Sequence, residues 1–303
     1  MALHVVMAGA SGFLGCPLRF ELVRRGHRVT SLVRRPARAH GEHSWDPTAP
    51  DPASAGLDRD LLEGAAVVVN LAGSPTLGNP HSRRWSTALR ETRVATTRLL
   101  AEAVAASERR PALLAGNAVG WYGDHGDQPL TEAADSRGTS LMTSVCREWH
   151  DAALPAADAG ARVAWLRTAP VMDRRNAPLK QLRPLFRAGL GARLGSGRQR
   201  MPMVSLRDWV DAVAFVAEHD DLAGPVNLAA PRLPTNAEFT RTLAELVHRP
   251  AFLVAPSPAL RLAAGRLAPE LLGSVNVVPS VLTSAGFVFR DVDGESVLRT
   301  GLA

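Results

Sequence analysis

The sequence predicts an α/β protein with a Rossmann-like, doubly wound parallel sheet and a smaller C-terminal substrate lobe. Three observations carry this prediction: short apolar runs alternate with helical patterns in the first half of the chain, a glycine-rich turn follows the first run, and the alternation stops after Thr168. Strands that alternate with helices need right-handed crossover connections, which build a parallel sheet with helices on both faces.

The strands are expected at short, nearly continuous apolar runs, which are typical of strands buried on both faces. These runs lie at residues 4–8, 28–33, 65–71, 111–116 and 162–167. The first helix follows the glycine turn and ends at Gly26, because glycine readily adopts the conformation that terminates a helix. Two more helices are expected over residues 85–106 and 143–159, the second distorted by Pro155.

The pattern becomes less regular after Thr168, where prolines interrupt the chain. The expected elements are helices over 174–190 and 208–219, with Asp208 as a helix cap, a glycine-rich loop over 189–197 and a strand over 226–228. We therefore expect a first domain over residues 1–170, to which 205–230 returns, and a C-terminal lobe over 171–303 with an interleaved boundary.

Composition excludes several classes of protein. The 303 residues carry a formal charge of +6, almost wholly as arginine, and the arginines are spread along the chain without a long basic run. One tyrosine and eight phenylalanines offer little for stacking on bases, so we expect no nucleic-acid partner. Two cysteines make no disulfide framework or zinc site. Without a leader or a long apolar segment, the protein is expected to be cytoplasmic and to have no membrane partner.

The sharpest motif is Gly-Ala-Ser-Gly-Phe-Leu-Gly at residues 9–15, directly after the first strand. Gly9 permits a tight turn, Gly12 lets the backbone approach a pyrophosphate, and Gly15 lets helix and strand pack closely. The helix that follows presents free N–H groups and a partial positive charge to phosphates. The alternative is a plain strand–turn–helix with incidental glycines, but the spacing and the context both favour dinucleotide binding.

The end of the second strand indicates which dinucleotide. NAD sites usually have an acidic residue there, which bonds to the ribose 2′-hydroxyl. This chain instead has Arg34 and Arg35, and paired guanidinium groups suit a 2′-phosphate. The alternative is a solvated basic turn. We expect the cofactor to be NADP(H).

Motifs along the whole chain then resemble one family. Besides the glycine turn, they are Asn70-Leu71-Ala72-Gly73, Arg84-Trp85, Val119-Gly120-Trp121-Tyr122-Gly123, Val145-Cys146 with Trp149, Leu166-Arg167, Gly189-Leu190-Gly191, Gly224-Pro225-Val226-Asn227 with Ala230-Pro231 and Asn236, and Gly286-Phe287. The sequence resembles the extended short-chain dehydrogenases/reductases, in their atypical, sugar-nucleotide-epimerase-like branch.

The resemblance implies a cofactor site. Gly9, Ser11, Gly12, Phe13, Leu14 and Gly15 would line the pyrophosphate, Arg34 and Arg35 the adenosine phosphate, Leu71, Ala72 and Gly73 the adenosine and its ribose, and Asn117, Thr168 and Val171 the nicotinamide end.

The family's catalytic residues do not carry over. Active members use a Tyr-x-x-x-Lys pair with a serine and an asparagine. Tyr122 is the sole tyrosine and Lys180 the sole lysine. Aligned on Trp149, the sequence has Met142 at the tyrosine position and Cys146 at the lysine position. The serine position falls at Asn117 or Ala118, and the asparagine position at Arg93.

Other residues could do chemistry instead. Tyr122 is the best remaining proton donor, with Asn117 as an amide donor and Arg93 as a cation that could lower the tyrosine pKa; the alternative is that Tyr122 only packs under the loop. The weaker candidates are His125 and His150 as surface or acid/base groups, Glu132 as a cap or an acid, and Cys146 as a small buried residue. Arg167, Arg198, Arg200 and Arg207 could reach an anionic substrate.

We expect an NADP(H)-binding oxidoreductase that acts on an unidentified small molecule, as a monomer or homodimer, and needs no metal. Two alternatives stay open. One is a non-catalytic NADP(H) sensor or scaffold, and the other is an isomerase, lyase or cyclase without net redox change, because fold alone does not determine function.

Overall fold

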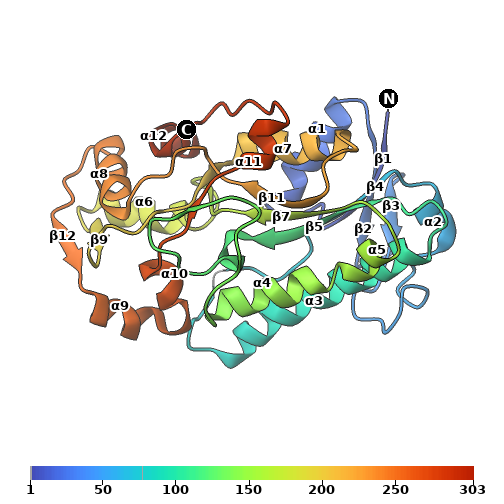
Figure 1. Cartoon of the computed structure of the whole chain (residues 1–303), viewed down its shortest axis with the longest axis horizontal. Helices are drawn as coiled ribbons and strands as arrows, with labels where there is room; N and C mark the ends of the chain where they lie inside the picture. Colours follow the sequence, from blue (N-terminus) through green and yellow to red (C-terminus); the bar gives the residue numbers. More distant parts are fainter. Residues whose placement is uncertain (1, 77) are drawn as a thin grey trace.

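A seven-stranded parallel sheet runs through the larger part of the molecule (Figure 1). The computed structural model describes residues 2–76 and 78–303. The strand order is β11-β7-β5-β4-β1-β2-β3. The strands are β1 (His4–Ala8), β2 (Arg28–Val33), β3 (Glu42–Ser44), β4 (Val67–Asn70), β5 (Ala112–Ala118), β7 (Val163–Thr168) and β11 (Gly224–Leu228). The predicted doubly wound parallel sheet is confirmed.

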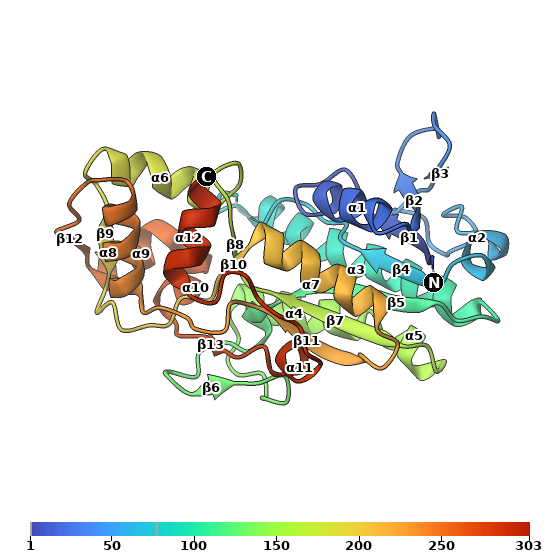
Figure 2. The same cartoon turned by 90° about the horizontal axis from the view of Figure 1, so that it is seen from above.

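Helices cover both faces of this sheet, as alternate side chains of β1 illustrate. Val5 and Met7 pack into one apolar cluster with α1 and α7, whereas Val6 and Ala8 pack into another with α3 and α5. The helices are α1 (Gly15–Arg24), α7 (Leu206–Glu218) and α11 (Ser280–Ser284) on the first face, and α2 (Arg59–Glu63), α3 (Arg83–Ala106) and α5 (Leu154–Asp158) on the second, with α4 (Leu141–Asp151) beside α3. Figure 2 shows α1 and α7 lying together along the sheet.

The smaller lobe lies at one end of the molecule, on the left in Figures 1 and 2. It contains α6 (Leu179–Arg187), β9 (Ala192–Leu194), α8 (Asn236–Leu246), β12 (Leu253–Ala255), α9 (Ser257–Ala264), the 3-10 helix η2 (Gly265–Leu267), α10 (Ala268–Leu272) and α12 (Gly294–Leu302). Three short parallel pairs complete the fold: β9 with β12, β8 (Val171–Met172) with β10 (Val204–Ser205), and β6 (Pro129–Leu130) with β13 (Asn276–Val277). Residues 206–228 form α7 and β11, so this late segment adds an edge strand to the main sheet.

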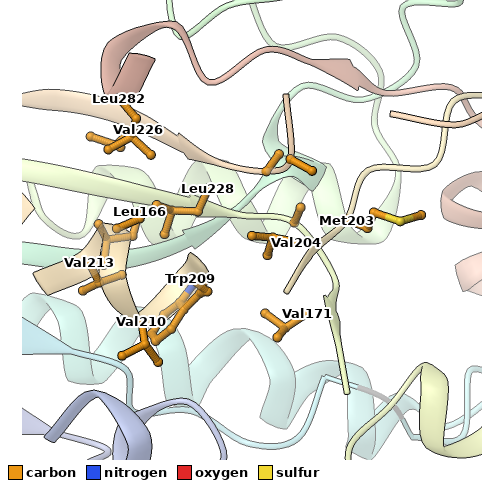
Figure 3. Close-up of a cluster of buried hydrophobic side chains, with 14 of the residues drawn as sticks. Leu166, Val171, Met203, Val204, Trp209, Val210, Val213, Val226, Leu228 and Leu282 are labelled. Carbon is orange, nitrogen blue, oxygen red and sulfur yellow. The ribbon is translucent and has the colours of Figure 1, made fainter. Parts of the chain in front are cut away.

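The junction between sheet and lobe is an apolar cluster around Trp209 of α7 (Figure 3). Leu166 of β7 and Val226 of β11 pack on one side of it, and Val171 and Val204 on another. The indole Nε1 of Trp209 donates to Thr168 Oγ1 at 3.1 Å. This packing fixes the chain where it leaves the end of β7.

Several predicted elements differ in their bounds. The helix expected over 143–159 is two helices, because Pro155 occupies the first turn of α5 and cannot continue the hydrogen-bond ladder of α4. The helix expected from residue 174 begins at Leu179, after a turn.

The cap predicted at Asp208 is wrong. Ser205 caps α7, because its Oγ accepts from Asp208 N at 3.3 Å. The buried Asp208 carboxylate instead accepts from the backbone N–H groups of Arg290 and Asp291 at 3.0 and 2.8 Å. Asp208 therefore ties α7 to the C-terminal segment.

Candidate functional site

The glycine turn between β1 and α1 has the geometry of a phosphate cradle. Gly9 has a φ of +80°, and it lies so near the loop after β4 that a Cβ on Gly9 would be 2.6 Å from the Leu71 carbonyl carbon. A Cβ on Gly15 would be 2.1 Å from Gly9 O. The turn closes with Gly12 N donating to Gly9 O at 3.0 Å. Only glycine fits at positions 9 and 15, because a Cβ at either would collide with backbone. No side chain at these two positions therefore covers the backbone of the turn.

The beginning of α1 has no side-chain cap, although Cys16 N donates to Gly12 O at 2.9 Å. Leu14 is the N-cap residue and gives no side-chain hydrogen bond to the turn. The N–H groups at this helix end therefore have no side-chain acceptor from the cap, and the helix dipole adds partial positive charge there. This is the end expected to meet a pyrophosphate.

The two arginines after β2 differ in their surroundings. Arg35 makes a bidentate pair with Glu42, at 2.6 Å from NH2 to Oε1 and 2.9 Å from NH1 to Oε2. Hydrogen bonding from Arg35 lowers the pKa of Glu42 to about 2. Arg34 is exposed and forms no ion pair with any carboxylate in the described ranges. Arg34 is thus the guanidinium available to a 2′-phosphate, while Arg35 is held by β3, a strand that the sequence did not predict.

The loop after β4 lies against the glycine turn. Asn70 is fully buried; its Oδ1 accepts from Ala72 N at 3.0 Å and its Nδ2 donates to Thr97 Oγ1 at 2.8 Å. These bonds set the course of Leu71, Ala72 and Gly73 beside Gly9. The three residues expected beside the adenosine therefore adjoin the turn.

Thr168 and Val171, which we expect near the nicotinamide, mark the exit from β7. Thr168 Oγ1 accepts from Trp209 and donates to Leu166 O at 3.2 Å. Val171 is buried in β8. Both residues are fixed by packing rather than exposed on a loop.

The two positions at which the sequence leads us to expect the family's tyrosine and lysine are apolar. Met142 and Cys146 of α4 pack with Leu89 of α3 in a small hydrophobic cluster. Burial raises the pKa of the Cys146 thiol to about 12. Neither side chain can exchange a proton at neutral pH.

Asn117 is the second-to-last residue of β5 and is buried. Its Nδ2 donates to Cys146 O at 3.1 Å and its Oδ1 accepts from Ala118 N at 2.8 Å. The amide therefore joins β5 to α4, and both of its ends are bonded within the protein.

Tyr122 is fully buried in a polar cluster rather than facing a cleft. Its hydroxyl donates to Asn227 Oδ1 at 2.7 Å and accepts from Arg167 NH1 at 2.8 Å. Burial raises the pKa of Tyr122, and the Arg167 charge opposes this shift. The expectation that Arg93 is the cation beside this hydroxyl is wrong, because Arg167 occupies that place.

Arg167 holds the centre of this cluster. It is 2% exposed, lies 3.6 Å over the Trp121 ring, and donates from NH1 to the carbonyl of Glu132 at 3.1 Å. The Glu132 Oε1 accepts from the backbone N–H groups of Asn227 and Val281 at 3.2 Å each. Glu132 therefore bonds to the first turn of α11, a helix that is distant in sequence, rather than to a helix next to it in the chain. Arg167 is therefore a structural residue and does not reach solvent.

The remaining candidate side chains have different surroundings. Arg200 pairs with Asp127 at 2.6 Å and Arg207 with Asp291 at 2.6 Å. Arg198 is exposed and makes no ion pair within the described parts of the chain. His150 stacks on Trp165 at 4.3 Å between ring centroids, and burial lowers its pKa. The His125 ring bonds to Tyr122 O at 3.1 Å.

Arg93 is buried on α3 and reaches the loop after β4. Its NH2 donates to Ser74 O at 2.9 Å and Thr76 Oγ1 at 3.0 Å, and its NH1 donates to Leu89 O at 3.0 Å. The guanidinium lies 5.3 Å from the Trp149 ring centroid. It therefore joins α3, α4 and the Gly73–Thr76 loop.

Sequence reasoning missed Glu270, which reaches this region from the smaller lobe. Its Oε1 accepts from Ser140 Oγ at 2.7 Å and from Met142 N at 3.2 Å, at the beginning of α4. Leu267 packs against the Met142 cluster nearby. No local signal could have found Glu270, because its partners lie about 130 residues earlier in the chain.

The described residues contain neither a membrane-spanning helix nor a metal-binding cluster. Over residues 2–76 and 78–303, no helix is long and apolar enough to cross a membrane. Across the same ranges, no three or more His, Cys, Asp or Glu side chains are grouped so as to hold a metal ion.

Comparison with known proteins gives two family matches. The model of the NAD dependent epimerase/dehydratase family matches residues 5–229. A domain of unknown function, DUF1731, matches residues 255–300, the region that contains Glu270.

Individual relatives extend over nearly the whole chain. An epimerase family protein of Mycobacterium bovis is 41% identical over 291 residues, covering 94% of this chain and 93% of its own. The epimerase family protein SDR39U1 of Bos taurus is 32% identical over 308 residues, covering 99% of this chain and 100% of its own. The crystal structure of human SDR39U1 with NADPH superposes with a TM-score of 0.84 at 26% identity, and the match covers 98% of each chain.

Proposed function

The chain belongs to the NAD dependent epimerase/dehydratase family, and from that premise we propose that it binds NADP(H) and transfers a hydride between this cofactor and a small molecule. The single observation that carries the proposal is the glycine turn, in which a side chain at Gly9 or Gly15 would collide with backbone. The human relative solved with NADPH supports the same cofactor.

The residues present fit this cofactor. The turn of residues 9–15 would hold the pyrophosphate at the N-terminus of α1. Arg34 would hold the 2′-phosphate, since Arg35 is already paired with Glu42. The missing acidic residue at the end of β2 favours NADP(H) over NAD(H). When bound, the nicotinamide supplies the hydride, and the chain's part is to orient it.

The substrate class follows from the apolar positions on α4. Met142 and Cys146 can neither give nor take a proton at neutral pH. Reduction of a carbonyl needs a donor for the developing alkoxide, whereas an iminium or a polarised C=C bond places less demand on one. We therefore favour an enone or an iminium as the acceptor. Tyr122 and Asn117 then have structural roles, because both are hydrogen-bonded within the protein.

The burial of these side chains also favours a second function, that of a non-catalytic NADP(H) sensor or scaffold. Tyr122 and Asn117, the two residues that the sequence favoured as donors, are both hydrogen-bonded to the protein itself. A protein that binds NADP(H) tightly without turnover, as a sensor or a scaffold, would need no such donor.

One experiment separates these functions. Stopped-flow oxidation of NADPH is followed over a panel of carbonyl, enone and iminium compounds, with product analysis by mass spectrometry. Turnover limited to enones or iminium ions is the expected result. Tight NADPH binding without turnover supports the sensor, and product formed without net NADPH oxidation indicates an isomerase, lyase or cyclase.

A further inference from the structure

The outer end of the smaller lobe exposes an apolar strand. β12 lies at the left edge of the molecule in Figures 1 and 2, and its strand partner in the described part of the chain is β9. Phe252, directly before the strand, is 87% exposed, and Leu253 and Val254 within it are 48% and 49% exposed. Proteins usually cover or charge such an edge, because an open apolar strand pairs readily with another chain.

The same strand has free backbone groups. Gly195 N donates to Ala255 O at 2.9 Å, so Ala255 and the alternate residue Leu253 direct their backbone groups towards β9. Val254, between them, directs its N–H and C=O away from β9, and across residues 2–76 and 78–303 these groups have no hydrogen-bond partner. An added strand would satisfy both groups.

A groove adjoins this strand. Its volume is about 500 Å³, and it lies between α8 and the segment of residues 249–254. Ala237, Thr240 and Ala244 of α8 line it with small side chains. Because alternate side chains of a strand point to the same side, a segment paired with β12 could place apolar side chains in this groove.

The rim of the groove is basic. Arg193, Arg241 and Arg249 line it together with one acidic residue, Glu245. Glu245 Oε1 lies 4.0 Å from Arg241 Nε. Arg193 and Arg249 donate instead to backbone carbonyl groups, at 3.0 and 3.1 Å. These two guanidinium groups therefore have no carboxylate partner in the described ranges.

Neighbouring elements add to this charge. Residues 179–194, which include α6 and β9, contain Lys180, Arg183 and Arg187 besides Arg193, and no acidic residue. The carbonyl that accepts from Arg249 Nε is that of Arg187, so the end of α6 lies beside the groove. The surface around β12 therefore attracts negative charge.

We propose that the open edge of β12 and the adjoining groove, together the β12 surface, bind an extended acidic segment of another protein as an added strand. The main chain of the segment pairs with Val254, its apolar side chains enter the groove, and its carboxylates meet Arg193 and Arg249. This interaction is independent of the proposed function, because it requires neither NADP(H) nor turnover.

Two other occupants match the β12 surface less well. A second copy of the chain would bring the same arginines face to face, and like charges across an interface oppose binding. An anionic lipid surface would match the charge, but it offers no strand to pair with Val254.

The first test measures binding of a fluorescent peptide, Val-Glu-Val-Glu-Val-Glu, to the whole chain by fluorescence anisotropy. One control peptide has lysine in place of each glutamate, and the other has N-methyl groups on its backbone amides, which then cannot pair with a strand. The acidic peptide is expected to bind, and each control to bind at least about tenfold more weakly. No binding of the acidic peptide, or equal binding of either control, overturns the proposal.

Protein variants locate the interaction. Arg249→Glu reverses a charge at the groove, and Val254→Pro removes the outward N–H at a position where an edge strand tolerates proline. Each should weaken peptide binding by about tenfold. Arg98→Glu is the charge control, because Arg98 is an exposed arginine of α3, and it should bind the peptide as the wild type does. Full affinity in Arg249→Glu would contradict the assigned surface.

The remaining outcomes decide between occupants. Dimers in light scattering that Val254→Pro abolishes would identify a second copy, and would overturn the proposal. Phosphatidylserine vesicles that bind the wild type but not Phe252→Ser, without peptide binding, would identify a lipid surface and also overturn it. Should Val254→Pro fail to fold in a thermal melt, the N-methylated peptide decides on the wild-type protein.

Discussion

At the residue scale, Gly15 shows why the expected cofactor site requires glycine at a particular position. Its missing side chain lets α1 approach β1, with the Gly9 carbonyl where a Cβ would otherwise lie. The sequence motif predicted this close approach, because the spacing of the three glycines is typical of a phosphate-binding turn between a strand and a helix. The prediction succeeded because the signal is local.

Gly15→Ala is expected to lower NADPH affinity by at least about a hundredfold, since the Cβ would collide with backbone that cannot move without breaking the turn. Calorimetry measures the affinity and a thermal melt the stability. Gly138→Ala is the control: Gly138 also has a positive φ, +79°, but open space around it. That control should cost about 1 kcal/mol of stability and leave binding unchanged. Normal affinity in Gly15→Ala would contradict the cradle.

Tyr122 illustrates what the sequence could not decide. Its position after β5 suits both a proton donor and a packing residue, and the choice depends on Arg167 and Asn227, which lie 45 and 105 residues away. Only the tertiary structure shows that the hydroxyl is enclosed by these two side chains.

Tyr122→Phe is expected to destabilise the protein by about 1–3 kcal/mol, because Arg167 NH1 and Asn227 Oδ1 each lose a buried partner. Urea unfolding measures this loss. NADPH affinity should remain within about twofold of the wild type. Unchanged stability together with lost turnover would instead identify Tyr122 as the proton donor.

At the scale of elements, α1 is fastened to α7 by a network of charges. Arg25 binds Glu21 on its own helix at 2.7 Å, and Asp211 and Glu218 of α7 at 2.9 Å each. His27 adds a second contact to Glu218 at 2.9 Å. The helix whose N-terminus follows the glycine turn is thus held at its C-terminal end by α7 as well as by the sheet.

The network predicts a pH dependence. Hydrogen bonding from Arg24, aided by Arg25, lowers the pKa of Glu21 from its ordinary value of 4.5 to about 2. A carboxyl with a lowered pKa contributes its full stability above the ordinary value, and this contribution disappears as the pH falls from 4.5 towards 2. Glu21→Gln should cost about 1 kcal/mol at neutral pH, discounted for solvent screening, and should flatten the stability profile in that window. An identical profile in variant and wild type would exclude the network as its cause.

The elements were predictable where the pattern is long and local. Strands that are buried on both faces consist of apolar runs, which are visible in the sequence. The observed bounds of β1, β2 and β4 lie within a few residues of the predicted ones. β3 was missed because its sequence, Glu-His-Ser, has no apolar pattern and exists only by pairing with β2. The early start of α4 follows from Ser140, a cap that the apolar pattern alone did not reveal.

At the scale of the whole molecule, the smaller lobe is bonded to the sheet domain through partly buried polar contacts. Glu270 binds the beginning of α4, and Asp208 binds the chain before α12. Such pairings join residues far apart in sequence, and for this reason no sequence pattern predicts them. They explain why the fold class was predictable while the surroundings of α4 were not.

Glu270→Ala should lower stability by about 1–3 kcal/mol, because Ser140 Oγ and Met142 N lose their acceptor. Limited proteolysis should then release the smaller lobe faster. Glu91→Ala, at an exposed position on α3, is the control and should have little effect. Equal proteolysis of the two variants would mean that Glu270 does not hold the lobe.

The central claim is that the backbone of residues 9–15 and the guanidinium of Arg34 bind a 2′-phosphorylated dinucleotide. Calorimetric titration of ligand-free protein with NADPH and with NADH tests it most directly. The account predicts that NADPH binds at least about tenfold more tightly than NADH, and that Arg34→Ala removes this difference. Absence of binding to either dinucleotide, or a preference for NADH, would contradict it.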